Sequence, residues 1–353
     1  MSSPLVVRSS KGEYEVTFVE HASERIAGLV AEGAQVVCDA NVARIHADLI
    51  AGVPKDQLVL LEALEPNKTM DKAQWLMQTV SGRQLRRNQQ LVAIGGGIVQ
   101  DVTAFSASIL YRGIDWTFVP TTLLAQADSC IGGKTSINLG DRKNLIGSFH
   151  PPAEVVVDLG FLESLSDDDI RSGIGEMMHY FLYADSPLAQ ALIDDHAAVL
   201  SDRKKLRPYI EESLTIKRVV IEEDEFDRGE RNKFNYGHTF GHALEAVTRF
   251  AVNHGQAVTV GMDLANRLST EHGMLDETEA GRLHQLLAVN LPKYDWASLD
   301  LDEYLNALGS DKKNVSADLT CILSRGPGKL FKHSLPIDAS LRRSISEYFA
   351  SIS

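Results

Sequence analysis

Three histidines lie close together in the second half of the chain, at positions 238, 242 and 254. His238 and His242 are four positions apart in a segment with helical spacing of its apolar residues, so both imidazoles leave one helix face. His254 follows beside Gly255, where the backbone can come close. Neutral imidazole is the commonest protein ligand for Zn²⁺. The spacing predicts a metal site; the alternative is a set of ordinary surface or core histidines.

A carboxylate lies in an apolar helical segment further upstream. Glu176 follows Gly175 and stands among isoleucine, methionine and tyrosine side chains. Burial of such a carboxylate without a cation or metal partner is costly. We therefore expect Glu176 to be a third ligand, with an exposed glutamate on a polar helix face as the alternative.

A glycine run follows a buried strand predicted at residues 91–94. Gly95, Gly96 and Gly97 stand before a helical segment, where backbone N–H groups can approach a phosphate. This arrangement predicts a site for a dinucleotide pyrophosphate, with Asp101 one helical turn further; a tight turn without ligand is the alternative. Asp39, after a strand at 36–38, is placed to accept hydrogen bonds from a ribose or to cap the next helix.

Hydroxyl and basic residues follow in the same half of the chain. Thr121 and Thr122 come after a strand predicted at 116–119 and are suited to nucleotide contacts. Lys134 lies in a fragment similar to a P-loop, but Asp128 stands where that motif needs its first glycine, so we exclude a nucleoside triphosphatase. Two lysines and an amide remain, suited to one phosphate monoester: Lys134, Lys143 and Asn144.

The order of predicted elements indicates two domains. Short strands alternate with helices up to about residue 160, which predicts a parallel sheet in an α/β, Rossmann-like nucleotide-binding domain at 1–160. Helical periodicity then dominates, which predicts a mainly α-helical metal-binding domain at 161–353. We expect helices at 70–87, 167–183, 188–200, 206–223, 235–250, 255–272 and 277–291, strands at 319–324 and 329–332, and a final helix from Ala339.

Composition limits the possible partners. With 353 residues, 44% hydrophobic and 24% charged, the chain is long enough for two domain cores. The net charge of -13 argues against nucleic acid as a partner. No apolar run is long enough to span a membrane, and the start has no secretion signal, so we expect a cytoplasmic protein. Cys38, Cys130 and Cys321 are far apart and are expected to be buried thiols.

From about Asp39 to Lys313 the chain resembles 3-dehydroquinate synthase and the related sugar phosphate cyclases. The densest matching parts are Gly95–Asp101, Tyr111–Gly113, Val119–Asn138, Lys143–Gly147, Asn235–Glu245 and His254–Gly255. The resemblance implies an NAD-binding α/β domain, a helical metal-binding domain, an active site in the cleft between them and a homodimer.

The resemblance also implies roles for single residues. Zn²⁺ or Co²⁺ would be bound by Glu176, His238 and His254, with His242 beside the metal as an acid/base or phosphate-contacting residue. NAD is expected at Asp39, Glu65, Lys68, Gly95, Gly96, Gly97, Asp101, Thr121 and Thr122, with Lys143 nearby. The sugar phosphate is expected at Asp128, Lys134, Asn144, His179, Lys217, Arg231 and Asn235, with Lys312 or Lys313 at its phosphate and Arg112 reaching it from a second subunit.

The implied reaction converts 3-deoxy-arabino-heptulosonate 7-phosphate into 3-dehydroquinate and phosphate. It proceeds by transient NAD-dependent oxidation, phosphate elimination, re-reduction and intramolecular aldol closure. Three positions depart from the family pattern: His179 replaces a lysine, Gln100 a glycine and Gln256 a glutamate. The family positions near the substrate carboxylate are kept in this chain, as Arg231, Lys217 and Asn235. A planar guanidinium matches a carboxylate, which favours 3-dehydroquinate formation.

Three alternatives remain open. The first is a cyclase of a secondary pathway that uses another sugar phosphate for a cyclitol or an aminated ring. The second is a metal-dependent polyol dehydrogenase, whose neutral substrate would give no anionic partner to Lys134, Lys143, Asn144 and Arg231. The third is a nucleotide-binding regulatory protein that has lost its chemistry at His179.

Overall fold

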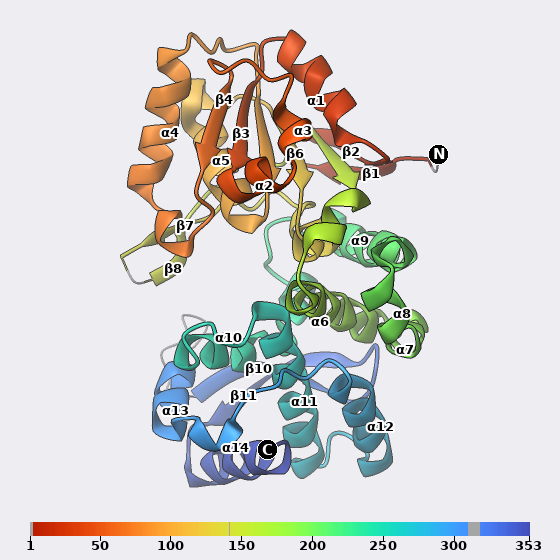
Figure 1. The fold of residues 1–353 in the computed structure, drawn as a ribbon. Helices are drawn as coiled ribbons and strands as arrows, with labels where there is room; N and C mark the ends of the chain where they lie inside the picture. Colours follow the sequence, from red (N-terminus) through yellow and green to blue (C-terminus); the bar gives the residue numbers. More distant parts are fainter. Residues whose placement is uncertain (1–2, 141, 310–317) are drawn as a thin grey trace. The chain divides into compact units, whose positions relative to one another are not determined.

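The computed structural model describes residues 3–140, 142–309 and 318–353 (Figure 1). They form two compact units. Unit 1 contains Met1–Leu165 and Lys217–Glu225, and unit 2 contains Ser166–Ile216 and Phe226–Ser353. The expected ranges 1–160 and 161–353 did not anticipate that the segment Lys217–Glu225 belongs to unit 1.

Unit 1 is built on a seven-stranded sheet with the order β1-β2-β9-β6-β5-β3-β4. Only β1 and β2 pair antiparallel, and every other neighbouring pair is parallel. The strand β5 is buried along its whole length, as expected for a parallel strand covered on both faces. The strands are β1 (Leu5–Ser9), β2 (Gly12–Val19), β3 (Gln35–Asp39), β4 (Leu58–Leu61), β5 (Leu91–Gly95), β6 (Trp116–Pro120) and β9 (Glu154–Asp158).

The direction of winding changes at β3. This strand pairs with β4 on one side and with β5 on the other, so the chain first moves to the sheet edge and then returns. Ligands of such sheets bind beyond the carboxyl ends of the strands at the point where the winding reverses. Because Cys38 pairs with Ile94, the carboxyl ends at Asp39 and Gly95 are neighbours there.

The helices of unit 1 largely follow the predicted pattern. α4 is shorter than expected and ends at Gly82, because the chain turns there and Gln84 adopts a φ of +62°. The short hairpin of β7 (Ile137–Leu139) and β8 (Arg142–Ile146) was not predicted. The helices are α1 (Ala22–Ala31), α2 (Ala40–Ile45), α3 (Ala47–Ile50), α4 (Met70–Gly82) and α5 (Gly97–Ile109), with 3₁₀ turns η1 (Glu65–Asn67), η2 (Leu110–Arg112) and η4 (Leu159–Ser164) and the π-helical turn η3 (Ala125–Ser129).

Unit 2 is mainly helical, as predicted. The expected helix at 188–200 is interrupted at Asp195, and α13 was missed. The helices are α6 (Asp167–Ala184), α7 (Leu188–Asp194), α8 (His196–Ser201), α9 (Arg207–Glu223, whose end from Lys217 belongs to unit 1), α10 (His238–Val247), α11 (His254–Glu271), α12 (Glu277–Ala288), α13 (Leu301–Gly309) and α14 (Ala339–Ser351). Three 3₁₀ turns, η5 (Arg203–Leu206), η6 (Glu230–Asn235) and η7 (Trp296–Ser298), and the hairpin of β10 (Asp318–Ser324) and β11 (Leu330–Pro336) complete the unit.

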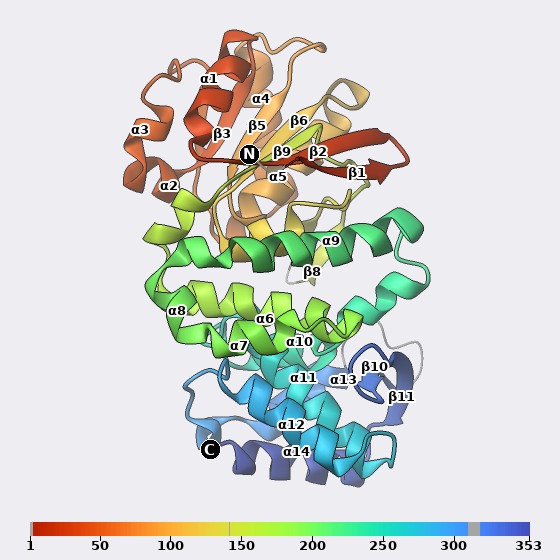
Figure 2. The same cartoon turned by 90° about the vertical axis from the view of Figure 1, so that its right-hand side faces the viewer.

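The helix α11 forms the centre of unit 2 (Figure 2). It packs against α6, α10, α12 and α14 and is buried along most of its length. The three cysteines are buried free thiols, which confirms that expectation. Among the described residues, no helix combines the length and apolar character that crossing a membrane requires. The α/β unit followed by a helical unit confirms the predicted fold class.

Candidate active site

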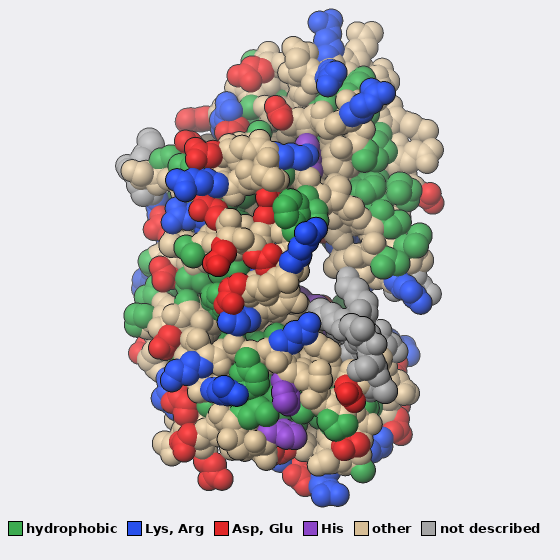
Figure 3. Space-filling model, turned by 180° about the vertical axis from the view of Figure 1, so that it is seen from behind, with side chains coloured by type: hydrophobic (Ala, Val, Ile, Leu, Met, Phe, Trp, Pro, Cys, Tyr) green, Lys and Arg blue, Asp and Glu red, His purple; other side chains and the backbone are tan. Residues whose placement is uncertain are grey.

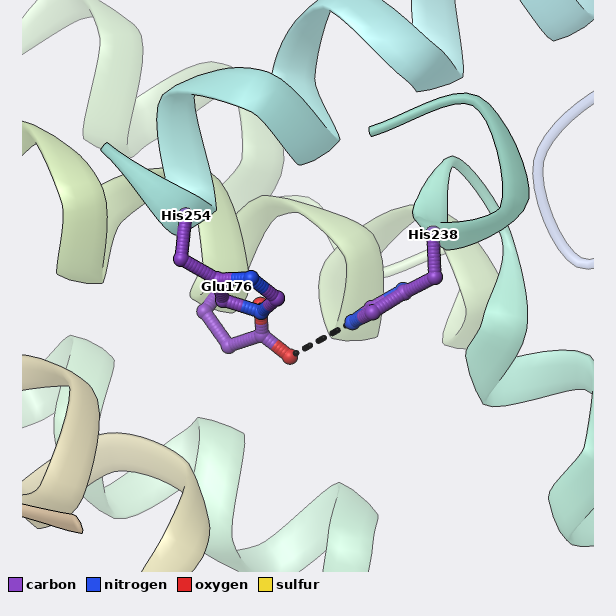
Figure 4. Close-up of side chains that lie close together, drawn as sticks. All are labelled: Glu176, His238 and His254. Carbon is purple, nitrogen blue, oxygen red and sulfur yellow. Dashed lines mark ion pairs between the residues drawn. The ribbon is translucent and has the colours of Figure 1, made fainter. Parts of the chain in front are cut away.

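Glu176, His238 and His254 converge in unit 2 (Figure 4). They come from α6, α10 and α11, and one ligand atom from each lies within 4.8 Å of the others. The Nε2 atom of His238 lies 3.3 Å from Oε1 of Glu176, and Nε2 of His254 lies 3.6 Å from Oε2. Two imidazole nitrogens and one carboxylate thus face a common point, which is the donor set of a catalytic zinc site.

Glycines beside Glu176, His238 and His254 bring the helices that carry these residues into close contact. A Cβ built on Gly175, next to Glu176, would overlap the carbonyl oxygen of Gly255, next to His254. Gly237, which precedes His238, adopts a φ of +80° and packs on the backbone of α11 at Val258. Since no larger residue fits at these contacts, the glycines allow the backbones to approach until the three side chains meet.

The electrostatics of Glu176 favour a bound cation. Its side chain is 4% exposed, and Oε2 has no hydrogen-bond partner in the described part of the chain. Burial alone would raise the pKa of this carboxyl, but the imidazoles of His238, His179 and His254 lower it well below its ordinary value. A buried carboxylate with an unsatisfied oxygen between two imidazoles fits a divalent metal ion.

The Nδ1 atoms of His238 and His254 have acceptors. Nδ1 of His238 lies 3.2 Å from the carbonyl oxygen of Tyr236, and Nδ1 of His254 lies 2.9 Å from Oε2 of Glu245. Each acceptor favours a proton on Nδ1. With an ion in place of the Nε2 proton, both rings would present the Nε2 lone pair to it, beside Glu176.

His179 and His242 occupy different environments. His179 is buried, with Nδ1 2.8 Å from the carbonyl oxygen of Glu176 and its ring against His238. His242 is exposed and its ring stacks on His254 with a centroid distance of 5.6 Å. Its ligand atom groups with those of Glu245 and His254 rather than with Glu176 and His238. The spacing of His238 and His242 along the helix had predicted that both would bind one ion, whereas the structure places them in different groups.

Two further residues expected at the substrate lie on η6. Arg231 is buried, and the Nδ2 atom of Asn235 donates a hydrogen bond to the carbonyl oxygen of Asn232 at 2.9 Å. Lys312 and Lys313 lie outside the described residues.

The predicted pyrophosphate site lies where the winding of the sheet reverses in unit 1. α5 begins after Gly96, which has no side chain to cap the first N–H groups of the helix. Thr121 donates its backbone N–H to the carbonyl oxygen of Gly95 at 3.0 Å, and a Cβ on Gly96 would lie 3.0 Å from Thr122. A Cβ on Gly97 would meet open space. An anion can therefore approach the start of α5.

Asp39 caps α2. Its Oδ1 accepts a hydrogen bond from the backbone N–H of Asn41 at 2.8 Å. This is the helix-capping role that the sequence offered as the alternative to ribose binding. Burial raises the pKa of the Asp39 carboxyl. Hydrogen bonding to a ribose stays a prediction.

A polar network continues from α5 to the β7–β8 hairpin. Nζ of Lys68 lies 2.5 Å from Oδ2 of Asp101 and 2.6 Å from Oδ1 of Asn144. Asn138, which sequence reasoning did not select, donates to Oε1 of Glu65 at 2.8 Å and accepts from the backbone of Asn144 at 2.9 Å. Lys143 lies 3.8 Å from the same Glu65 carboxylate. The predicted cofactor residues Glu65, Lys68, Asp101 and Lys143 thus lie together, and the substrate candidate Asn144 lies with them.

The substrate candidate Asp128 lies on the π-helical turn η3. Lys217 donates to its Oδ1 at 2.8 Å and to its carbonyl oxygen at 2.6 Å. Gln100, one of the departures from the family pattern, exchanges two hydrogen bonds of 2.6 Å with Ser129 on the same turn. Such π turns frequently occur at functional sites. Lys134 and Arg112 are exposed elsewhere in the unit.

Comparisons with known proteins agree with this geometry. The family model for the N-terminal domain of 3-dehydroquinate synthase matches residues 58–172, and the C-terminal model matches residues 173–314. A 3-dehydroquinate synthase from Rhodopseudomonas palustris is 36% identical, covering 93% of this chain and 92% of that protein.

Solved structures agree in fold. One is 2-deoxy-scyllo-inosose synthase in complex with carbaglucose-6-phosphate, NAD⁺ and Co²⁺, with a TM-score of 0.87, 24% identity and coverage of 98% of this chain and 99% of that one. Another is 2-epi-5-epi-valiolone synthase from Streptomyces hygroscopicus with NAD⁺ and Zn²⁺, with a TM-score of 0.82, 24% identity and coverage of 96% of each chain. From the two family models and the close relative together, this chain belongs to the 3-dehydroquinate synthase family.

Proposed function

We propose that the protein is a lyase that converts 3-deoxy-arabino-heptulosonate 7-phosphate into 3-dehydroquinate and phosphate. The observation that carries the proposal is the convergence of Glu176, His238 and His254 in a chain of the 3-dehydroquinate synthase family. The start of α5, beyond Gly95–Gly97 where the winding reverses, supports a dinucleotide in unit 1.

Glu176, His238 and His254 would hold Zn²⁺ or Co²⁺, and the edge formed by Gly95–Gly97 and Asp39 would hold NAD. When bound, NAD supplies reversible oxidation of a secondary hydroxyl, and the metal supplies positive charge beside the oxygen atoms that become negative. Three protein ligands leave room in a catalytic zinc site for a substrate oxygen.

The residues of the chain would bind the substrate through the steps that follow oxidation. An oxidised substrate would have an acidic C–H next to its ketone and would lose phosphate by β-elimination; re-reduction and ring opening would then precede the aldol closure. Arg231 offers a planar pair of donors to the substrate carboxylate, and Lys134 and Asn144 offer a cation and donors to the phosphate. The imidazole of His242 is exposed and is of the type that most often serves as a general acid or base.

An exposed apolar surface supports a homodimer. Met70 and Trp75 on α4, Ile109 at the end of α5, and Leu139 and Leu145 on the hairpin are between 39% and 54% exposed. The elements α4, α5 and β7 pack against one another. Hydrophobic side chains gather on the surface of unit 1 in Figure 3. Exposed apolar side chains on neighbouring elements are typical of a protein interface, and a second copy of the chain is the occupant we propose.

A second candidate is a cyclase that acts on another sugar phosphate. His179 favours it, because an imidazole is shorter than the lysine that the family pattern has there and would make different contacts with substrate hydroxyls. Arg231 weighs against it, because its planar guanidinium offers a pair of parallel donors that match a carboxylate, which such a substrate would lack.

The test is direct. Purified protein is mixed with a catalytic amount of NAD, Zn²⁺ and the heptulosonate phosphate; phosphate release is followed, and the product is identified by mass and NMR. The proposal predicts 3-dehydroquinate without accumulation of NADH. No phosphate release from this substrate, with release from another sugar phosphate, would favour the second candidate. Steady accumulation of NADH with a simple polyol would instead indicate a dehydrogenase.

A further inference from the structure

The ring of His254 has acidic partners at both of its nitrogens. Nδ1 lies 2.9 Å from Oε2 of Glu245, and Nε2 lies 3.6 Å from Oε2 of Glu176. An ionised carboxylate can only accept a hydrogen bond, so the shorter contact fixes the ring proton on Nδ1. The Nε2 lone pair is then available on the side of Glu176.

We infer that Glu245 is a positioning residue for the metal site: it orients His254 and selects the tautomer that binds the ion through Nε2. The inference rests on the proposed function, because it takes Glu176, His238 and His254 as the metal ligands. Carboxylates that accept from a ligating imidazole increase its basicity, and their loss typically weakens metal binding by about 10- to 100-fold.

The two ligand histidines differ in their need for such support. His238 donates toward a neutral backbone oxygen, that of Tyr236, and its side chain is 12% exposed. The side chain of His254 is 30% exposed, so packing restricts its ring less. A charged acceptor gives a stronger hydrogen bond than a neutral one and can compensate for this freedom.

The position of Glu245 on α10 makes the arrangement rigid. It lies seven residues after His238, two helical turns along the same face. α10 therefore supplies one ligand directly and supports a second on α11, against which it packs. The Glu245 side chain is only 13% exposed, which strengthens its hydrogen bond to His254.

A competing assignment makes Glu245 itself a ligand, in the group with His242 and His254. The structure favours the positioning role, because Nδ1 of His254 is at hydrogen-bond distance from Glu245, while the buried Oε2 of Glu176 lacks a hydrogen-bond partner among the described residues. A metal ion bound through Nδ1 of His254 would overturn the inference.

The test compares Glu245→Gln and Glu245→Ala with Asp263→Asn. The control removes the carboxylate from a second pair of the same kind in unit 2, in which Nδ1 of His284 lies 2.8 Å from Oδ2 of Asp263. The dissociation constant for Zn²⁺ is measured by competition with a chromophoric chelator, and circular dichroism checks the fold. We expect about 10- to 100-fold weaker binding in both Glu245 variants and unchanged affinity in the control.

A measurement on the unaltered protein does not depend on the folding of a variant. Zinc-loaded protein labelled with ¹⁵N-histidine should show His254 protonated at Nδ1 and metal-bound at Nε2 by NMR, with the signal assigned by its absence in His254→Asn. Unchanged Zn²⁺ affinity in folded Glu245 variants, or metal coordination through Nδ1 of His254, would overturn this inference but leave the proposed function standing. An unaltered protein that binds no zinc would overturn the proposed function and the inference with it.

Discussion

Gly175 of α6 and Gly255 of α11 pack backbone to backbone, so that a side chain on Gly175 would overlap the carbonyl oxygen of Gly255. The next residue on α6 is Glu176, and the residue before Gly255 is His254. The distance between two proposed metal ligands is therefore set by a contact that only glycine allows.

Gly175→Ala should separate the helices and damage the metal site. We expect a loss of about 1–3 kcal/mol in the free energy of unfolding, because the added methyl group meets backbone that cannot rotate away. Gly281→Ala on α12 is the control, since a Cβ there meets nothing within 4 Å, and alanine should stabilise that helix by about 1 kcal/mol. Urea denaturation measures both; equal stability of the two variants would contradict the account.

Lys68 and Asp101 form a second testable pair. Burial raises the pKa of the Asp101 carboxyl to about 6, and the opposing charge of Lys68 limits the rise. Because this pKa lies above its value in the unfolded chain, Asp101 favours the folded state more as the pH falls through 6.

Lys68→Met should raise the pKa of Asp101 further, because it removes the nearby positive charge. A ¹³C NMR titration of the carboxyl group, with Lys72→Met as the control on α4, would detect the change. A pKa that stays near 6 in Lys68→Met would show that the pair is not coupled.

His284 should make stability depend on pH. Its hydrogen bond with Asp263 raises the pKa of the imidazole, although burial opposes this. The stabilisation is complete below the unfolded-state pKa of about 6.5 and is lost as the pH rises through the higher folded-state pKa.

The unfolding free energies of the unaltered protein and His284→Asn should therefore differ most in mild acid and converge in alkaline solution. Denaturant titrations at several pH values measure this difference. A difference in unfolding free energy that grows toward alkaline pH would contradict this prediction.

Trp75→Glu and Leu139→Glu should weaken the proposed homodimer, because each places a charge on the exposed apolar surface of unit 1. Light scattering after size exclusion should give twice the chain mass for the unaltered protein and a lower mass for the variants. Val219→Glu, at an exposed hydrophobic residue on α9, is the control. A measured mass of one chain for the unaltered protein would contradict the proposed homodimer.

Sequence patterns predicted the features that depend on neighbours along the chain. The apolar run of β5 followed by three glycines, and the helical spacing around Glu176, both lie in the expected elements. The β7–β8 hairpin was missed because its strands are short and β8 is exposed, so no apolar alternation marks them. The fold class could be predicted because its strands and helices alternate with clear periods.

The grouping of the site residues could not be predicted in the same way. Spacing along α10 places His238 and His242 on one face, but which of them faces Glu176 depends on how α10 packs against α6 and α11. Glu245 was not selected for the same reason: its partner His254 lies on another helix. Reasoning from the residues had proposed Glu176, His238 and His254 as ligands together with His242, and the resemblance to known cyclases moved His242 out of the ligand set.

The most direct measurement of the central claim is the anomalous diffraction of zinc-loaded crystals at the zinc edge. We predict one strong peak about 2.0–2.2 Å from a carboxylate oxygen of Glu176 and from Nε2 of both His238 and His254. In Glu176→Gln the peak should be lost together with turnover. No peak at this position, or full zinc occupancy in Glu176→Gln, would contradict the assignment of the metal site and the cyclase chemistry built on it.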